Sequence, residues 1–252
     1  MDPVVTVLAS EGAGTAVLLL LGVGVSANAT LTDTFGRGGG YLMVALGWSL
    51  GVFAGVYVAH PSGAHLNPAV TLAITAQSLL PGGPTELAPG IPVSLVTVLA
   101  YLVAELGGAF AGAVAAWAVY RPHFDRHPEP RETLGALATA PAVRSGPSNV
   151  LGEGVATFVL VLVLLVLART PTELGPLASA LVVLAVGLGL GGTTGWAINP
   201  ARDLAGRLAH AVLPIAGKGP SDWAYAWVPV VGPVAGGVLG GLAAHALGAV
   251  GG

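Results

Sequence analysis

Residues 63–70 read G-A-H-L-N-P-A-V, and residues 196–203 read W-A-I-N-P-A-R-D. Each stretch places an Asn-Pro-Ala triplet after a long apolar run. Asparagine is a favoured helix N-cap, and proline fits the first helical position because its missing N–H would have no partner there. Each triplet therefore predicts the start of a helix. The two helices, expected at 67–78 and 199–210, would be about 18 Å long, little over half of a hydrocarbon core of about 30 Å.

Composition places these short helices in a membrane protein. Hydrophobic residues make up 54% of the 252 residues and charged residues only 8%, whereas soluble domains have roughly 25% charged residues. Apolar runs that could cross a bilayer fall at about 5–27, 41–60, 93–119, 150–169, 177–191 and 225–248. The first run is longer than the apolar core of a signal peptide and lacks a basic flank, so we interpret it as a membrane span. Residues 121–149, rich in proline and charge, are expected to form an external loop.

The chain also contains an internal repeat. S-E-G-A-G-T, from Ser10, matches G-E-G-V-A-T, from Gly152, so that Glu11 aligns with Glu153. The first repeat (1–120) and the second (150–252) each contain three spans and one short helix. Because three is odd, the second repeat must enter the membrane from the opposite side, which is typical of channels and transporters. The sequence predicts a single all-α membrane domain, with six transmembrane helices and two half-helices in an inverted repeat.

This arrangement has an electrostatic consequence. Two half-helices entering from opposite faces would meet with their N-termini near the midplane, and each N-terminus carries roughly half a positive charge. A cation at that point, hydronium included, would be repelled. The preceding segments, 61–66 and 191–198, are expected to be extended and to line a polar cavity, since irregular backbone at membrane depth needs such a setting. The carbonyl groups expected to line it belong to Gly63, Ala64, His65, Gly195, Trp196 and Ala197.

S-G-A-H-L-N-P-A-V-T, G-W-A-I-N-P-A-R-D and the paired E-x-x-x-T together resemble the major intrinsic proteins, that is, the aquaporins and glycerol facilitators, over nearly the whole chain. The resemblance implies a right-handed bundle with one pore per subunit, assembled as a homotetramer in the plasma membrane. It implies that Glu11 and Glu153 accept hydrogen bonds from the backbone of the pore loops. It also implies that both triplets face the pore, through Asn67, Pro68, Ala69, Asn199, Pro200 and Ala201.

The same resemblance implies a selectivity filter. Arg202 matches the family's filter arginine, and Trp196 matches a position that is aromatic in glycerol facilitators. Gly187 matches a position where water channels have histidine, so a glycine there would widen the opening of the pore. We expect the fourth position to be Trp48, which requires one deletion in the turn at 59–62, because a polar turn is the easier place for a deletion; without it the position would be Gly47. An aromatic wall beside a fork of donors suits a polyol. Asp203 and Arg207, spaced i and i+4, should pair on the second half-helix.

Glu105 departs from the family pattern, which usually has glutamine at this position. We expect its carboxyl group either to be protonated or to bond to the backbone. Two features of the sequence disagree on the orientation of the chain in the membrane. The family topology places both termini inside the cell, but it puts most basic residues outside, against the positive-inside rule.

The favoured function is a passive channel for glycerol, similar small neutral solutes and water. The alternatives are a water-selective pore, a secondary active transporter and a structural membrane protein with a closed pore. Neither a catalytic arrangement nor a metal or cofactor site is expected. His123 and His127 are four residues apart, but their proline-rich segment argues against the helix that would align them. The net charge of −3 gives no reason to expect a nucleic-acid partner.

Overall fold

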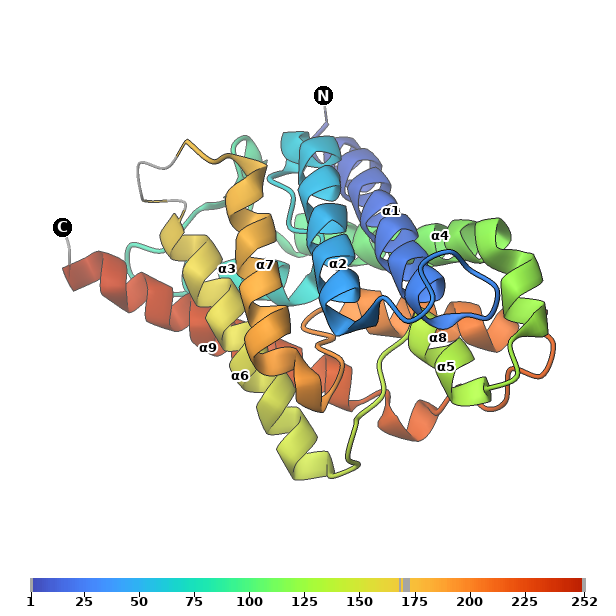
Figure 1. The fold of residues 1–252 in the computed structure, drawn as a ribbon. Helices are drawn as coiled ribbons and strands as arrows, with labels where there is room; N and C mark the ends of the chain where they lie inside the picture. Colours follow the sequence, from blue (N-terminus) through green and yellow to red (C-terminus); the bar gives the residue numbers. More distant parts are fainter. Residues whose placement is uncertain (1, 168, 170–172, 251–252) are drawn as a thin grey trace.

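The computed structural model describes residues 2–167, 169 and 173–250. In this part of the chain, six helical spans are long and apolar enough to cross a membrane, which confirms the predicted all-helical membrane fold. They are built on α1 (Pro3–Thr30), α2 (Gly40–Val58), α4 (Leu95–Arg126), α6 (Gly146–Leu167), α7 (Pro176–Leu190) and α9 (Val228–Val250) (Figure 1). The fourth predicted span, 150–169, ends here at Leu167, and residue 168 lies outside the described residues.

Shorter elements connect these spans. The half-helices are α3 (Pro68–Ser78) and α8 (Pro200–Val212), and a further short helix, α5, covers Pro130–Leu137. Three 3-10 turns are η1 (His60–Ser62), η2 (Gly191–Thr193) and η3 (Trp223–Tyr225). A two-stranded antiparallel hairpin, β1 (Glu86–Ala88) and β2 (Ile91–Pro92), lies between α3 and α4. Both half-helices begin where the triplets predicted, with asparagine as N-cap and proline in the first turn.

The two halves use the same helix pairing. α1 packs along α4 in the first half, and α6 packs along α9 in the second. In the first pair Gly108 lies against the backbone of Gly12, and in the second Gly236 lies against Gly154. A Cβ on Gly108 would stand 2.2 Å from the backbone oxygen of Gly12, and a Cβ on Gly236 would stand 2.0 Å from that of Gly154. The absence of a side chain at these two positions therefore lets the helix backbones touch, as small residues do in membrane bundles.

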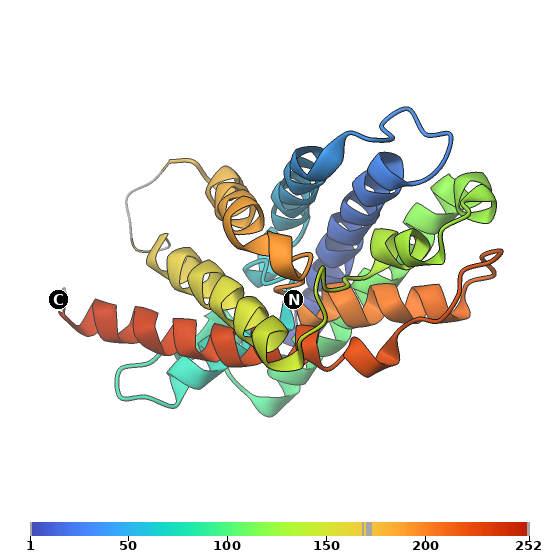
Figure 2. The same ribbon diagram turned by 60° about the horizontal axis from the view of Figure 1, so that its bottom comes forward.

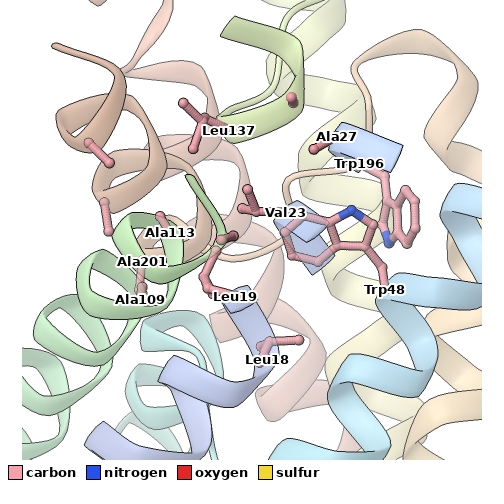
Figure 3. Packing of buried hydrophobic residues seen from close by; sticks show 14 of the residues in the cluster. Leu18, Leu19, Val23, Ala27, Trp48, Ala109, Ala113, Leu137, Trp196 and Ala201 are labelled. Atoms are coloured by element: carbon pink, nitrogen blue, oxygen red, sulfur yellow. The ribbon is translucent and has the colours of Figure 1, made fainter. Parts of the chain in front are cut away.

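The half-helices join the two halves. α3, from the first half, packs on α9, while α8, from the second half, packs on α4. α2 and α7 meet as well, and Figure 2 shows α8 running beside α4 after a rotation of the view. Small side chains such as Ala109, Ala113 and Ala201 fill the core where α4 and α8 approach α1 (Figure 3). Each half-helix is thus held by a span of the opposite repeat.

Residues 121–149 differ from the predicted loop. α4 continues through Pro122 to Arg126, α5 follows, and α6 already begins at Gly146. The reason is that α5 is amphipathic over only eight residues: Leu134 and Leu137 are buried while its charged residues face outward. Charge and proline concealed this short apolar face in the sequence. His123 consequently lies within a helix, and His127 is the residue that ends it.

Segments 61–66 and 191–198 are also not extended throughout. Each begins with a 3-10 turn, and each then has positive φ angles at matched positions. The angles are +80°, +55° and +56° at Gly63, Ala64 and Leu66, and +78°, +48° and +45° at Gly195, Trp196 and Ile198. The left-handed region is unfavourable for residues with a side chain. The same torsional pattern therefore recurs in both halves and must be held in place by surrounding contacts.

Candidate functional site

The two asparagines of the triplets meet at the centre of the bundle. Oδ1 of Asn67 accepts from the N–H of Ala69 at 2.9 Å, and Oδ1 of Asn199 accepts from the N–H of Ala201 at 2.9 Å. Each side-chain amide then reaches across to the other loop. Nδ2 of Asn67 donates to the carbonyl of Ile198 at 2.8 Å, and Nδ2 of Asn199 donates to the carbonyl of Leu66 at 2.7 Å. The N-termini of α3 and α8 consequently face one another.

Two buried glutamates hold the loops that lead to these asparagines. In the first half, the carboxylate of Glu11 accepts from the N–H groups of His65, at 3.0 Å, and Leu66, at 2.7 Å. In the second half, Glu153 accepts from Ala197 and Ile198 at 2.9 and 2.8 Å. These contacts give both acids the backbone partners that the family resemblance implied. They also supply the restraint that the positive φ angles require.

The same contacts set the direction of the carbonyl groups. Across a planar trans peptide, the C=O of one residue points away from the N–H of the next. Because the N–H groups of His65 and Leu66 point towards Glu11, the carbonyl groups of Ala64 and His65 point away from it. By the same argument, the carbonyl groups of Trp196 and Ala197 point away from Glu153. The glutamates therefore turn a row of acceptors towards the opposite side of each loop.

A cavity of about 280 Å³ lies on that opposite side. Both loops contribute to it, from Ala64 to Asn67 and from Gly195 to Asn199, whereas Gly63 is not among its lining residues. The remaining wall is largely apolar and comes from several spans: Leu18, Val44, Val52, Val56, Leu160, Leu164 and Val183. The cavity thus has one polar side, built from backbone and asparagine amides, and one apolar side.

Three of the expected filter residues lie together at this cavity. Trp48, Trp196 and Arg202 all line it, and each is less than 10% exposed. The guanidinium carbon of Arg202 lies 4.1 Å from the centroid of the Trp48 ring. Figure 3 shows the indoles of Trp48 and Trp196 entering the same region from different parts of the chain. Of the two candidates at the fourth position, Gly47 lies against Val25 of α1 and is not a lining residue.

Gly187 has a different setting from the one expected. It is not among the residues that line the cavity, and a Cβ there would stand 2.8 Å from Cε2 of Trp196. The indole of Trp196 occupies the space that a histidine would take, so the glycine accommodates a tryptophan. The carbonyl of Gly187 accepts from the hydroxyl of Tyr41 at 3.0 Å. Tyr41 lines the cavity and meets the Trp196 ring edge-on, with centroids 6.0 Å apart.

Residues 138–140 contribute to the cavity although no sequence motif marks them. Ala138, Thr139 and Ala140 line the cavity directly after α5. Two residues of α8 hold this segment. Nη1 of Arg202 donates to the carbonyl of Leu137, the last residue of α5, at 3.2 Å, and Asp203 accepts from the N–H of Thr139 at 2.8 Å. No local signal in the sequence indicates this contact, because the partners are more than sixty residues apart.

Asp203 and Arg207 form the pair that their spacing predicted. Nε of Arg207 lies 2.9 Å from Oδ1 of Asp203, and both side chains are fully buried. Arg207 also donates to the carbonyl groups of Thr139 and Ser221, at 2.7 and 2.9 Å. The pair therefore ties two loops to α8 on one side of the cavity.

Glu105 bonds to the backbone, one of the two outcomes expected for it. Its Oε1 accepts from the N–H of Asn67 at 3.2 Å and from the hydroxyl of Thr71 at 2.8 Å. Its Oε2 is buried and has no hydrogen-bond partner among the described residues. Glu105, on α4, thus supports the N-cap and the first turn of α3.

A membrane-embedded cavity between two facing half-helices, each from one half of an inverted repeat, defines a channel-type protein. Residues 3–244 match the family described as Major intrinsic protein, and the chain belongs to that family. It is therefore a multi-pass protein of the cell membrane.

Similar proteins agree with this assignment. The chain is 42% identical over 244 residues to glycerol uptake facilitator protein 3 of Lactiplantibacillus plantarum, covering 96% of each. It is 44% identical over 235 residues to the glycerol uptake facilitator protein of Bacillus subtilis, covering 92% of this chain and 81% of the relative. Its fold is similar to the X-ray structure of the aquaglyceroporin from Plasmodium falciparum, with a TM-score of 0.79, 29% identity and 96% of both chains covered.

Proposed function

We propose that the protein is a passive channel for glycerol and similar small neutral solutes, and that it also passes water while excluding protons and ions. The observation that carries the proposal is the two-sided cavity. Its loop side offers carbonyl groups and asparagine amides, and its other side offers aliphatic and aromatic carbon. A polyol has the same division, since its hydroxyl groups can face one wall while its CH and CH₂ groups face the other.

The proposed filter consists of Trp48, Trp196 and Arg202, with Gly187 providing room for Trp196 instead of for the solute. Arg202 supplies donors and a fixed positive charge, and the two indoles supply the apolar wall. Below the filter, we propose that Asn67 and Asn199 offer the passing solute their remaining amide hydrogens. Each asparagine uses one N–H for the opposite loop, and no second partner is found among the described residues.

Proton exclusion is proposed to follow from the two half-helix N-termini. Each contributes roughly half a positive charge at the point where they face one another. The hydrogen bonds from Asn67 to Ile198 and from Asn199 to Leu66 keep these termini together. A neutral solute does not feel this barrier, but a cation does.

Stopped-flow light scattering on proteoliposomes containing the full chain tests the function. We expect glycerol influx well above that of protein-free liposomes, with a low activation energy and no response to a proton or sodium gradient. Fast water flux with glycerol excluded would instead identify a water-selective pore, and a required ion gradient would identify an active transporter. Glycerol permeability that disappears on Arg202→Trp, with the protein still folded, would assign the flux to this cavity.

We also propose a homotetramer, in line with the family resemblance. Light scattering coupled to size-exclusion chromatography in detergent, corrected for the detergent mass, should give four copies of the 24.8 kDa chain. A monomeric mass in several mild detergents would contradict this assembly.

A further inference from the structure

Ser26, on α1, contacts Trp48, one of the proposed filter residues, and also lines the cavity itself. Its hydroxyl oxygen accepts from the indole N–H of Trp48 at 2.9 Å, and its own O–H donates to the carbonyl of Gly22 at 3.0 Å. Both side chains are buried, with 5% of Ser26 and 6% of Trp48 exposed. The hydroxyl therefore has a donor role and an acceptor role, and both are filled.

Gly22 completes the seat for the indole. It lies one helical turn before Ser26, so the two residues share a face of α1. A Cβ on Gly22 would stand 2.3 Å from Cε3 of Trp48, which means that the six-membered ring rests directly on this glycine. One end of the indole is thus packed against Gly22, and its N–H end is bonded to Ser26. Figure 3 shows the indole of Trp48 extending from α2 towards Val23 on α1.

This seat decides which chemistry Trp48 offers to the cavity. An indole has one polar group, its N–H donor. With that donor bound to Ser26, only carbon is left for a passing solute. Val44, Val52 and Val56, which line the cavity from α2, are also apolar, and the hydroxyl of Tyr41 on the same helix already donates to the carbonyl of Gly187. The guanidinium of Arg202, 4.1 Å from the ring centroid, is the donor group beside this wall.

We propose that Ser26 is a positioning residue for solute selectivity: by binding the indole N–H of Trp48, it keeps this wall free of hydrogen-bond donors and favours solutes with one apolar side. The inference rests on the proposed function. A wall without donors suits glycerol, whose carbon backbone presents C–H groups on one side. It is less suited to urea, which is planar and polar around its whole edge.

The main test is the ratio of glycerol to urea permeability in proteoliposomes carrying Ser26→Ala. Without this acceptor, the indole N–H can form a hydrogen bond only by turning towards the cavity, where it would bind urea. The ratio of glycerol to urea permeability should therefore fall roughly three- to tenfold, the range for one hydrogen bond. Ser26→Thr keeps the hydroxyl and should restore most of the ratio. Ser49→Ala is the matched control, because Ser49 is a buried serine next to Trp48 whose hydroxyl donates to the carbonyl of Ala45 and, within the described part of the chain, not to Trp48.

A double-mutant cycle separates positioning from general packing. Trp48→Phe removes the N–H, so Ser26→Ala should have no further effect on the ratio in that background. An unchanged ratio in Ser26→Ala alone would overturn the inference. So would an equal fall in the Trp48→Phe background or in Ser49→Ala.

A second measurement does not depend on flux. An electron density or cryo-electron microscopy map of Ser26→Ala should show the indole of Trp48 rotated from its seat against α1, whereas an unchanged indole would overturn the inference. Wild-type protein that passes no glycerol would contradict the proposed function instead. The map would then still decide whether Ser26 holds Trp48.

Discussion

Asn67 and Asn199 are linked reciprocally, because each side-chain amide donates to the carbonyl of the residue that precedes the other asparagine. The distances are 2.8 Å from Asn67 Nδ2 to Ile198 O and 2.7 Å from Asn199 Nδ2 to Leu66 O. Each asparagine at the same time caps its own helix. Each asparagine therefore fixes both the start of its own half-helix and the distance between the two half-helices. For this reason the two half-helices cannot shift independently.

Replacing Asn67 with aspartate tests the electrostatic part of this arrangement. Aspartate is also a good N-cap, so α3 should still begin at residue 68. Its carboxylate cannot donate to the carbonyl of Ile198, and its negative charge offsets the positive helix ends. At pH 8, proton flux into pyranine-loaded proteoliposomes should rise on the order of tenfold, equivalent to about 1.4 kcal/mol of barrier. Asn149→Asp is the control, because Asn149 is a buried asparagine at the start of α6, away from the cavity.

Proton flux as low as in the wild type would count against this account of Asn67→Asp. It would place the barrier elsewhere, with Arg202 as the remaining fixed charge at the cavity.

Gly187→Ala should narrow the filter indirectly. The new methyl group would stand 2.8 Å from the Trp196 indole, so the indole must shift, and we expect it to shift towards the cavity that it already lines. Overpacking of this kind lowers the stability of the fold by about 1–3 kcal/mol. We expect the displaced indole to raise the barrier to glycerol by about 1.4 kcal/mol, so glycerol flux should fall about tenfold while water flux falls less. Stopped-flow light scattering measures both. Gly187→His should act in the same direction and more strongly.

The matched control is Gly189→Ala, two residues further along α7, where an added Cβ meets no atom within 4 Å. If glycerol and water flux fell equally in Gly187→Ala, Trp196 would not belong to the filter.

Glu105→Gln and Glu105→Leu distinguish the charge of the carboxyl group from its role as hydrogen-bond acceptor for Asn67. Glutamine retains an oxygen that can accept from the N–H of Asn67, so glycerol flux and thermal stability should stay close to those of the wild type. Leucine leaves that buried N–H without its acceptor and should lower the free energy of unfolding by about 1–3 kcal/mol. Tryptophan fluorescence during heating of the detergent-solubilised protein measures the difference. A wild-type glycerol flux that varies with pH, and no longer does so in Glu105→Gln, would show that Glu105 gates the channel.

The Asp203–Arg207 pair should be sensitive to the loss of one partner. Both side chains are fully buried, and an uncompensated buried charge typically costs about 3–5 kcal/mol. Asp203→Leu should therefore destabilise the protein strongly, and the double variant Asp203→Leu/Arg207→Leu should recover part of the loss. Arg121→Leu is the control, since its pair with Asp125 has the same spacing but is exposed and should contribute less than about 1 kcal/mol. Additive losses in the double variant would mean that the two side chains do not act as a pair.

The sequence alone was sufficient for the spans, the half-helix starts and the inverted repeat. Those features depend on local chemistry: the length of an apolar run, the capping ability of asparagine before proline, and the parity of the spans. The pair of Asp203 and Arg207 was accessible for the same reason, because a separation of four residues places two side chains on one helix face. α5 was missed because its apolar face is only a few residues long and lies among charges.

Tertiary structure decided how these pieces form a cavity. The position of Trp48 at the cavity and of Gly47 against α1, the packing of Gly187 against Trp196, and the bond from Trp48 to Ser26 all depend on how helices from different parts of the chain are rotated against each other. Asn67 and Ile198 are 131 residues apart, and no periodicity extends over such a distance. Cap and hydrophobicity signals are properties of neighbouring residues, whereas a donor finds its acceptor across the bundle only after the chain has folded.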